Sequence, residues 1–472
     1  MAGLGTDPRR DRGGAPGFGT DLRLAWALTR GSDRREWWRW GLTALGAVPA
    51  TAFALAAAVL GGLRGGHDVP MGGGLLNQPG TRSGVIVALL LLLVPVLGFL
   101  GQCARIGAVH RDRRLAGLRL AGATAGQVRR IAALETGLAC LLGSVLVTAV
   151  AVPVLAAGWT DAPARVWAAV VVVAVGVPVL GAGAGALALR RVVASPLGWV
   201  RRVRQRTGRG PALAFLAGPA LVALMAVAAV TGTGGTSPWR AYAEGPLLVS
   251  GLLLAVGAGA VWLSGATARL TGRLLAPRAR SAAALIAAER LRDDPWAAAR
   301  THAAVLLVTV AGTGFVGVRQ ALLAELRRMS REGSLGSGVG YYTGGLNLTA
   351  AALAVALVIT LSGLAVGTAE SVATRRRGLA AQTAAGVPRA VLGRALLLET
   401  ALPLAPAVLL AGAGGMTVGT WYAALTTGPG APTVPYAALL VPVAVYAVCL
   451  LAAATALPLL RRTADPAQLR YV

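Results

Sequence analysis

Long apolar blocks, separated by short polar segments rich in arginine, run along the whole chain. Val85–Leu100 is one such block, and its positions do not alternate between apolar and polar residues. Crossing a hydrocarbon core about 30 Å thick takes roughly 20 mostly apolar helical residues, and only helices or closed barrels satisfy their backbone inside lipid. The pattern therefore predicts an all-α integral membrane protein with about ten transmembrane helices. The predicted spans are 41–63, 84–104, 132–156, 166–189, 212–231, 246–268, 302–320, 347–369, 396–418 and 435–460.

Composition agrees with this pattern and narrows the set of partners. Hydrophobic residues make up 56% of the 472 positions and charged residues 13%, which leaves too much apolar surface for a soluble protein. The net charge of +27 could suggest nucleic acid. However, all 45 basic residues are arginine and they gather between the apolar blocks, as in the cytoplasmic loops of membrane proteins. We therefore expect contact with membrane lipid and no nucleic-acid partner.

The distribution of arginine predicts the orientation. If the ten spans alternate in direction, the segments on the N-terminal side hold 37 of the 45 arginines and those on the opposite side hold 8. Arginine collects on the cytoplasmic side, so both termini are expected in the cytoplasm and the protein in the inner or plasma membrane of the cell. The first apolar block begins at about Gly41, too far in and too long for a cleaved signal peptide, so we expect it to be retained.

One stretch recurs at a constant offset of 264 residues. Arg113–Thr136 reads RRLAGLRLAGATAGQVRRIAALET and Arg377–Thr400 reads RGLAAQTAAGVPRAVLGRALLLET. Nine of the 24 positions are identical, including the glycine, two arginines and the final L-E-T. Matches of Ala and Leu are common in such a composition, but Gly, Arg, Glu and Thr in one register indicate an internal repeat.

Both copies predict a helix, a sharp turn and a second helix that leads into the next span. Gly122 and Gly386 are expected to end the first helix, because glycine readily takes the left-handed cap conformation. In the first copy Thr124 and Gln127 have the spacing of a capping box. In the second copy Pro388 stands where a helix start tolerates proline.

The repeat predicts the domain organisation. Residues 1–18 form a disordered cytoplasmic tail, 19–205 a first module of four spans, 206–270 two linking spans, and 271–472 a second module of four spans. Arg-rich segments at 22–40 and 284–301 are expected to be amphipathic helices that precede a span in each module. Six spans separate equivalent helices, so the two modules are parallel and related by an axis along the membrane normal.

The repeated stretch resembles the signature of FtsX-like permeases, which are the membrane subunits of ABC transporters. The resemblance lies in a basic loop, then L-x-x-L-x-x-x-G-[AV], then a short helix ending in L-E-T; the C-terminal RRTADPAQLR also resembles the family's closing segment. It implies that the turn between the second and third spans of each module contacts a cytoplasmic ABC ATPase, present in two copies. The ATPase-coupling residues so implied are Arg113, Arg114, Leu115, Leu118, Gly122, Thr124, Gln127, Arg130 and Glu135 in the first copy, and Arg377, Leu379, Gly386, Pro388, Arg389, Arg394 and Glu399 in the second.

The chain itself is not expected to be an enzyme or to hold a cofactor. A phosphate loop needs the lysine of G-x-x-x-x-G-K-[ST], and the chain contains no lysine, so ATP would be bound by the partner subunit. The three cysteines lie in or beside apolar blocks and the three histidines are isolated, so no metal site is expected.

The resemblance implies a permease that couples ATP hydrolysis to movement of a lipid, amphipathic or peptide-like cargo across or out of the membrane. Related permeases of antimicrobial-peptide resistance carry a large extracellular domain between the seventh and eighth spans, where this chain has only residues 321–346. This departure argues against a peptide-antibiotic cargo. One alternative is conformational signalling to a membrane partner. The other is an ion-coupled secondary transporter, against which no ionisable residue lies near the middle of any predicted span.

Glu135 and Glu399 stand at the cytoplasmic start of their predicted spans and allow two interpretations. The first is an interfacial carboxylate paired with a nearby arginine, which contributes about 1 kcal/mol or less when exposed. The second is a hinge latch that moves with the ATPase. The sequence favours the first.

Overall fold

The computed structural model describes most of the chain. The described residues are 34–63, 65–66, 76–77, 79–103, 117–118, 120–159, 162–188, 239–334, 339–426 and 435–463, with Gly19, Arg23 and Ala27. Within these ranges there is no strand, and nine helices are long and apolar enough to cross a membrane. The protein is therefore an all-α, multi-pass membrane protein, and nine of the predicted spans are confirmed.

The predicted features in the remaining residues lie outside the described part. These are the tail at 1–18, the fifth predicted span at 212–231, most of residues 22–33 of the segment at 22–40, and the C-terminal residues 464–472.

The nine apolar helices differ in length, and shorter helices join some of them. The long helices are α2 (Arg34–Gly61), α3 (Pro79–Cys103), α5 (Ala125–Gly158), α6 (Ala164–Ala188), α9 (Trp239–Leu275), α11 (Pro295–Arg331), α12 (Val339–Thr374), α14 (Arg389–Thr426) and α15 (Tyr436–Ala454). The short ones are η1 (Ala276–Arg278), α10 (Ala282–Asp293), α13 (Arg376–Ala384) and α16 (Leu457–Thr463).

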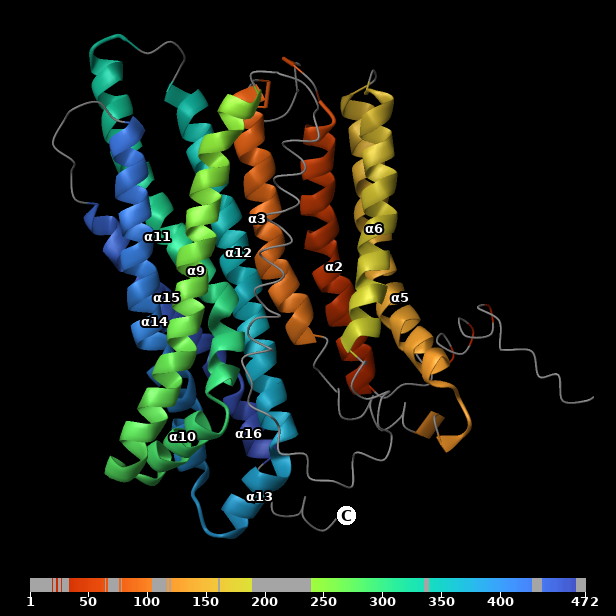
Figure 1. Ribbon diagram of the computed structural model, residues 1–472, viewed down its shortest axis with the longest axis vertical. Coiled ribbons are helices and arrows are strands. Elements are labelled where there is room, and N and C mark those ends of the chain that lie inside the picture. Colours follow the sequence, from red (N-terminus) through yellow and green to blue (C-terminus); the bar gives the residue numbers. More distant parts are fainter. Residues whose placement is uncertain are drawn as a thin grey trace, which may run out of the picture.

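The helices pack as two groups that meet along α3, which contacts both α12 and α11 (Figure 1). In the first group α2 contacts α3, α5 and α6, and in the second group α11 contacts α12, α14 and α15. The first helix of each group thus contacts the three long helices that follow it in the chain. The groups meet where α3 packs against α12, and α9 fills a position against α11, α14 and α3.

Glycine permits the closest helix contacts within each group. A Cβ at Gly143 of α5 would collide with the carbonyl of Ala44 on α2. In the second group a Cβ at Gly415 of α14 would collide with the carbonyl of Val310 on α11, and Gly314 and Gly419 bring the same two backbones together one turn further on. Small residues let helices approach closely in membranes, where packing rather than water exclusion drives association.

The predicted amphipathic helix at 284–301 is wrong in one respect, because the structure divides it into two helices. Helix α10 ends at Asp293, and Asp294 then caps α11, its Oδ1 accepting a hydrogen bond of 3.1 Å from the backbone N–H of Ala297. Pro295 follows at the first position of α11, where proline is favoured. The Asp-Pro pair is a helix-start signal in the sequence that the arginine spacing had obscured.

The segment 321–346, expected to be an outer loop, is mostly helix. Helix α11 continues to Arg331 and α12 begins at Val339, so both helices extend beyond the predicted spans. The sequence ALLAELRR after Gln320 consists of strong helix formers, and Arg328 pairs with Glu325 at 2.7 Å on one helix face. Helix propensity therefore extends the helices beyond the point where the hydrophobic pattern stops.

Candidate docking site

The two copies of the repeat form two turns at the same end of the bundle. The first glycine turn is residues 117–124, of which Arg119 lies outside the described residues, and the second glycine turn is residues 381–388. Each precedes a long helix, α5 or α14 (Figure 1). Of the residues implied as ATPase-coupling, Arg113, Arg114 and Leu115 lie outside the described residues, and all others are described.

The two turns have the same backbone. Gly122 has a φ of +96° and Gly386 a φ of +89°, the left-handed conformation predicted for both. The Ala123 N–H donates to the Leu118 carbonyl at 3.0 Å, and the Val387 N–H donates to the Gln382 carbonyl at 3.0 Å. These bonds are 264 residues apart and are the longer hydrogen bond of a Schellman motif.

A second hydrogen bond also recurs at this offset. The Ala121 N–H donates to the Gly117 carbonyl and the Ala385 N–H to the Ala381 carbonyl, each at 2.9 Å. In the second turn the Gly386 N–H also bonds to the Thr383 carbonyl at 3.0 Å, which completes the motif. The offset of 264 residues that aligns the two sequences therefore also aligns their backbone hydrogen bonds.

Helix starts after the two turns differ in chemistry, as the sequence predicts. Thr124 is the N-cap of α5, and its hydroxyl accepts a hydrogen bond of 3.2 Å from the Gln127 N–H. Helix α14 begins at Arg389, so Pro388 lies one position before the first helical residue rather than at it. Its carbonyl accepts the N–H groups of Val391 and Leu392.

Surface exposure follows the same register. Each turn presents small or uncharged side chains in its centre and an arginine one helical turn further on. The residues exposed at equivalent positions are Gly117, Leu120, Ala121, Gly122, Thr124, Gly126 and Arg130 in the first copy, and Ala381, Ala384, Ala385, Gly386, Pro388, Ala390 and Arg394 in the second. Arg129 and Arg389 are exposed as well, but neither has an exposed equivalent among the described residues. Such a surface lets another backbone approach closely and offers a cation at its edge.

The buried residues directly beneath the two turns are also equivalent in the repeat. Under the first turn, Leu118 and Ala123 pack on buried Val128 and Ala132. Under the second, the equivalent buried residues are Leu392 and Leu396, with Val387 against them. Here further elements join: Leu379 of α13, Val372 of α12, Ile286 of α10, and Ala456 and Leu460 at α16.

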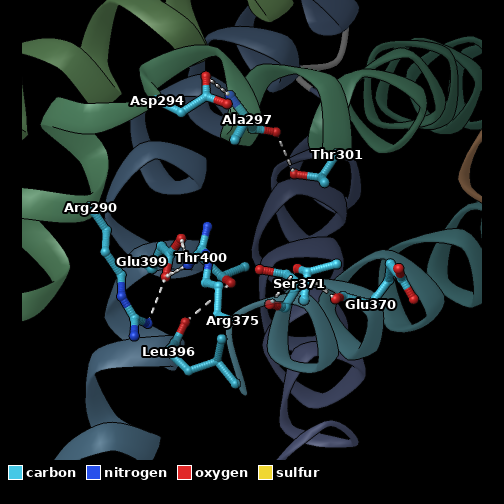
Figure 2. Close-up of polar contacts among 11 residues, drawn as sticks. Arg290, Asp294, Ala297, Thr301, Glu370, Ser371, Arg375, Leu396, Glu399 and Thr400 are labelled. Atoms are coloured by element: carbon cyan, nitrogen blue, oxygen red, sulfur yellow. Dashed lines mark hydrogen bonds and ion pairs between the residues drawn. The ribbon is translucent and has the colours of Figure 1, made fainter. Parts of the chain in front are cut away.

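A cluster of charged groups holds the second turn to its neighbours (Figure 2). Glu399 of α14 accepts hydrogen bonds from Arg290 of α10 at 3.2 Å and from Arg375, which follows α12, at 2.8 Å. The side chains of Arg290 and Glu399 are only 17% and 18% exposed, so solvent screens this pair weakly. We call Arg290, Arg375 and Glu399 the Glu399 clasp.

The clasp confirms the interpretation of Glu399 as a carboxylate paired with a nearby arginine. Sequence reasoning did not single out Arg290 or Arg375, because each is one arginine among many and only the fold brings them to Glu399. The equivalent Glu135 of α5 is buried, with 4% exposure. Arg377, Arg389 and Arg394 are exposed and form no ion pair with another described residue, so their charges face outward.

The fold and this site define a class, a helical multi-pass membrane protein with two exposed glycine turns at one end. Three comparisons with known proteins found no related protein. No family model matches the chain, and neither a curated protein nor a solved structure matches it.

Proposed function

We propose that this chain is the permease subunit of an ABC transporter, and that its two glycine turns dock a separate cytoplasmic ATPase, one copy at each turn. The observation that supports this most strongly is the agreement of the two turns in φ, hydrogen bonding and exposed positions at one constant offset. A turn that only joins two helices needs no such repetition, whereas two copies of one partner need two similar surfaces.

The long helices suggest how docking would act on the membrane part. Helices α5 and α14 have 34 and 38 residues, against the roughly 20 that cross the hydrocarbon core. Each therefore extends out of the membrane, with its turn at the exposed end. ATP-driven closure of the docked subunits would push on both turns and tilt α5 and α14.

The arginine distribution supports a cytoplasmic position for both turns in the inner or plasma membrane. The chain has no lysine for a phosphate loop, so ATP hydrolysis is assigned to the partner. A lipid, amphipathic or peptide-like cargo taken from the bilayer fits the outward apolar faces of α5 and α6, which are 22% and 17% buried over their spans.

Co-purification from the native membrane tests the proposal. We expect an ABC ATPase to accompany the wild-type chain and to be lost from Leu120→Glu and Ala384→Glu, because both positions are exposed at the turns and a carboxylate there introduces no packing clash. Gly259→Leu is the control, since Gly259 is exposed on α9 with nothing within 4 Å of a Cβ.

The outcomes separate the proposal from its alternatives. A chain that purifies without any ATPase, and that drives uptake with a proton gradient alone, would be a secondary transporter. ATPase activity that is independent of cargo but requires a further membrane protein would indicate signalling. Rapid transport of a hydrophilic cargo by the purified complex would contradict the bilayer-derived cargo.

A further inference from the structure

The end of α9, the following η1 and the two residues after it carry a cluster of arginines without acidic neighbours in the sequence. Arg269, Arg273, Arg278 and Arg280 are all exposed, and none forms an ion pair with another described residue. The segment 245–288 contains these four arginines and no Asp or Glu. The surface therefore carries four positive charges that the described part of the chain does not neutralise.

Leucines lie beside these arginines. Leu270 and Leu274 of α9 are 56% and 52% exposed, and Leu285 of the adjacent α10 is 45% exposed. Arg269 and Arg273, like Leu270 and Leu274, are four residues apart, so a basic stripe and an apolar stripe run side by side on α9. We call these four arginines and three leucines the α9 patch.

The position of the α9 patch relates it to the membrane boundary. The candidate span of α9 is Gly251–Arg278, so the patch stands where that span ends. Helix α10 packs closely on the same end of α9, where a Cβ at Gly272 would come within 2.9 Å of the Ala288 carbonyl (Figure 1). At the end of a membrane span, acyl chains give way to phosphate groups.

We propose that the α9 patch binds the headgroups of anionic phospholipids. Guanidinium groups bind phosphate oxygens in bidentate fashion, and basic residues next to a span are attracted to anionic lipid surfaces. The exposed leucines contact the acyl chains of the same lipids. A soluble acidic partner would account for the arginines but not for the leucines beside them. This proposal does not depend on the docking of an ATPase.

Lipid binding to the purified full-length chain in detergent tests the proposal. The probes are fluorescent short-chain phosphatidylglycerol and phosphatidylcholine with identical chains. We expect tighter binding of phosphatidylglycerol, weakened at least tenfold by the double substitution Arg269→Gln/Arg273→Gln, which corresponds to about 1.4 kcal/mol. Binding of phosphatidylcholine should be unchanged.

The control is Arg327→Gln/Arg331→Gln, which removes two exposed arginines with the same spacing near the far end of α11. We expect it to leave phosphatidylglycerol binding unchanged. An equal loss in both double variants would show an effect of net charge and overturn the proposal. Equal affinity of the wild-type chain for the two lipids would overturn it as well.

Two further measurements need no variant. Phosphatidylglycerol binding should weaken as sodium chloride rises, because salt screens exposed charges, and salt-independent binding would overturn the proposal. Inorganic phosphate at the same concentration as the lipid should not displace it, because it lacks the acyl contacts with the leucines. Displacement would show a site for free phosphate instead of a lipid surface.

Discussion

The two glycine turns share one backbone but differ in what lies beneath it. The first turn packs on residues of its own copy, Leu118, Ala123, Val128 and Ala132. The second packs on the equivalent residues and also on α10, α12, α13 and α16, and the Glu399 clasp ties α14 to Arg290 and Arg375. Within the described residues, the second turn is thus anchored to more of the molecule.

This difference separates two levels of structure. The turn itself is local, because a glycine and a few backbone hydrogen bonds determine it in both copies. The support is tertiary, because it depends on which helices the fold brings to each turn. Two turns with the same backbone can therefore differ in how firmly they are held to the rest of the described bundle.

The largest expected effect comes from the packing beneath the turns. Leu392→Ala should destabilise the protein by about 3 kcal/mol, because this fully buried leucine leaves a cavity among several elements. Leu118→Ala, at a half-buried leucine of the smaller cluster, should lower the free energy of unfolding by only about 1 kcal/mol. Denaturant unfolding in detergent micelles measures both, and equal losses would show that the turns are equally supported.

The second expected difference between the two copies concerns the ion pairs of the Glu399 clasp. Glu399→Gln should cost about 2 kcal/mol, because it leaves Arg290, whose side chain is 17% exposed, and the more exposed Arg375 without their shared counter-ion. Glu289→Gln is the matched control on α10, since Glu289 pairs with Arg292 but both side chains are 49% exposed. That change should alter stability by less than about 0.5 kcal/mol. A similar melting-temperature shift for both variants would mean that the clasp does not hold the second turn.

The turns should be equal in one respect. Gly122→Ala and Gly386→Ala should each cost about 1 kcal/mol, because a Cβ at either position contacts nothing within 4 Å and only the left-handed backbone is strained. Gly126→Ala, at an exposed helical glycine with equally open space, should be neutral or slightly stabilising. Thermal unfolding compares the three, and a much larger loss at one turn would show that its glycine has a role beyond conformation.

The smallest expected effect lies at the helix starts. Thr124→Ala should cost about 0.5–1 kcal/mol, because it removes the hydroxyl that caps α5. Pro388→Ala removes no side-chain hydrogen bond and should cost only a few tenths of a kcal/mol, through the greater freedom of the unfolded chain. Hydrogen exchange at the first amides of α5 and α14 measures both. Faster exchange at α14 alone would reverse the expected order.

The local features were the most predictable ones from sequence. Nine predicted spans are confirmed, because apolar length suffices to identify them. The left-handed glycines and the Thr124 cap are also confirmed, since each depends on neighbouring residues alone. The extension of α11 to Arg331 was not predicted, because the predicted spans follow hydrophobicity and not helix propensity. The break at Asp294 was not predicted either, because the Asp-Pro capping signal was not used.

Features that depend on the fold could not be predicted in the same way. Arg290 and Glu399 are 109 residues apart, and no spacing rule joins them. The same holds for the apolar cluster beneath the second turn, to which several separate elements contribute. The role of the turns as docking surfaces remains a proposal founded on the resemblance and on the shared geometry.

The direct backbone contact between α11 and α14 at Gly314, Gly415 and Gly419 has a mechanical consequence. No side chain separates the two backbones at these positions, so we expect α11 and α14 to move together there. The part of α14 that follows Pro403 and Pro406 contains Gly415 and Gly419 and is about 30 Å long, so a tilt of about 5° of this part would displace its end by roughly 3 Å. Because α11 continues to Arg331, such a movement would reach the adjoining ends of α11 and α12, at the opposite end of the molecule from the second glycine turn (Figure 1).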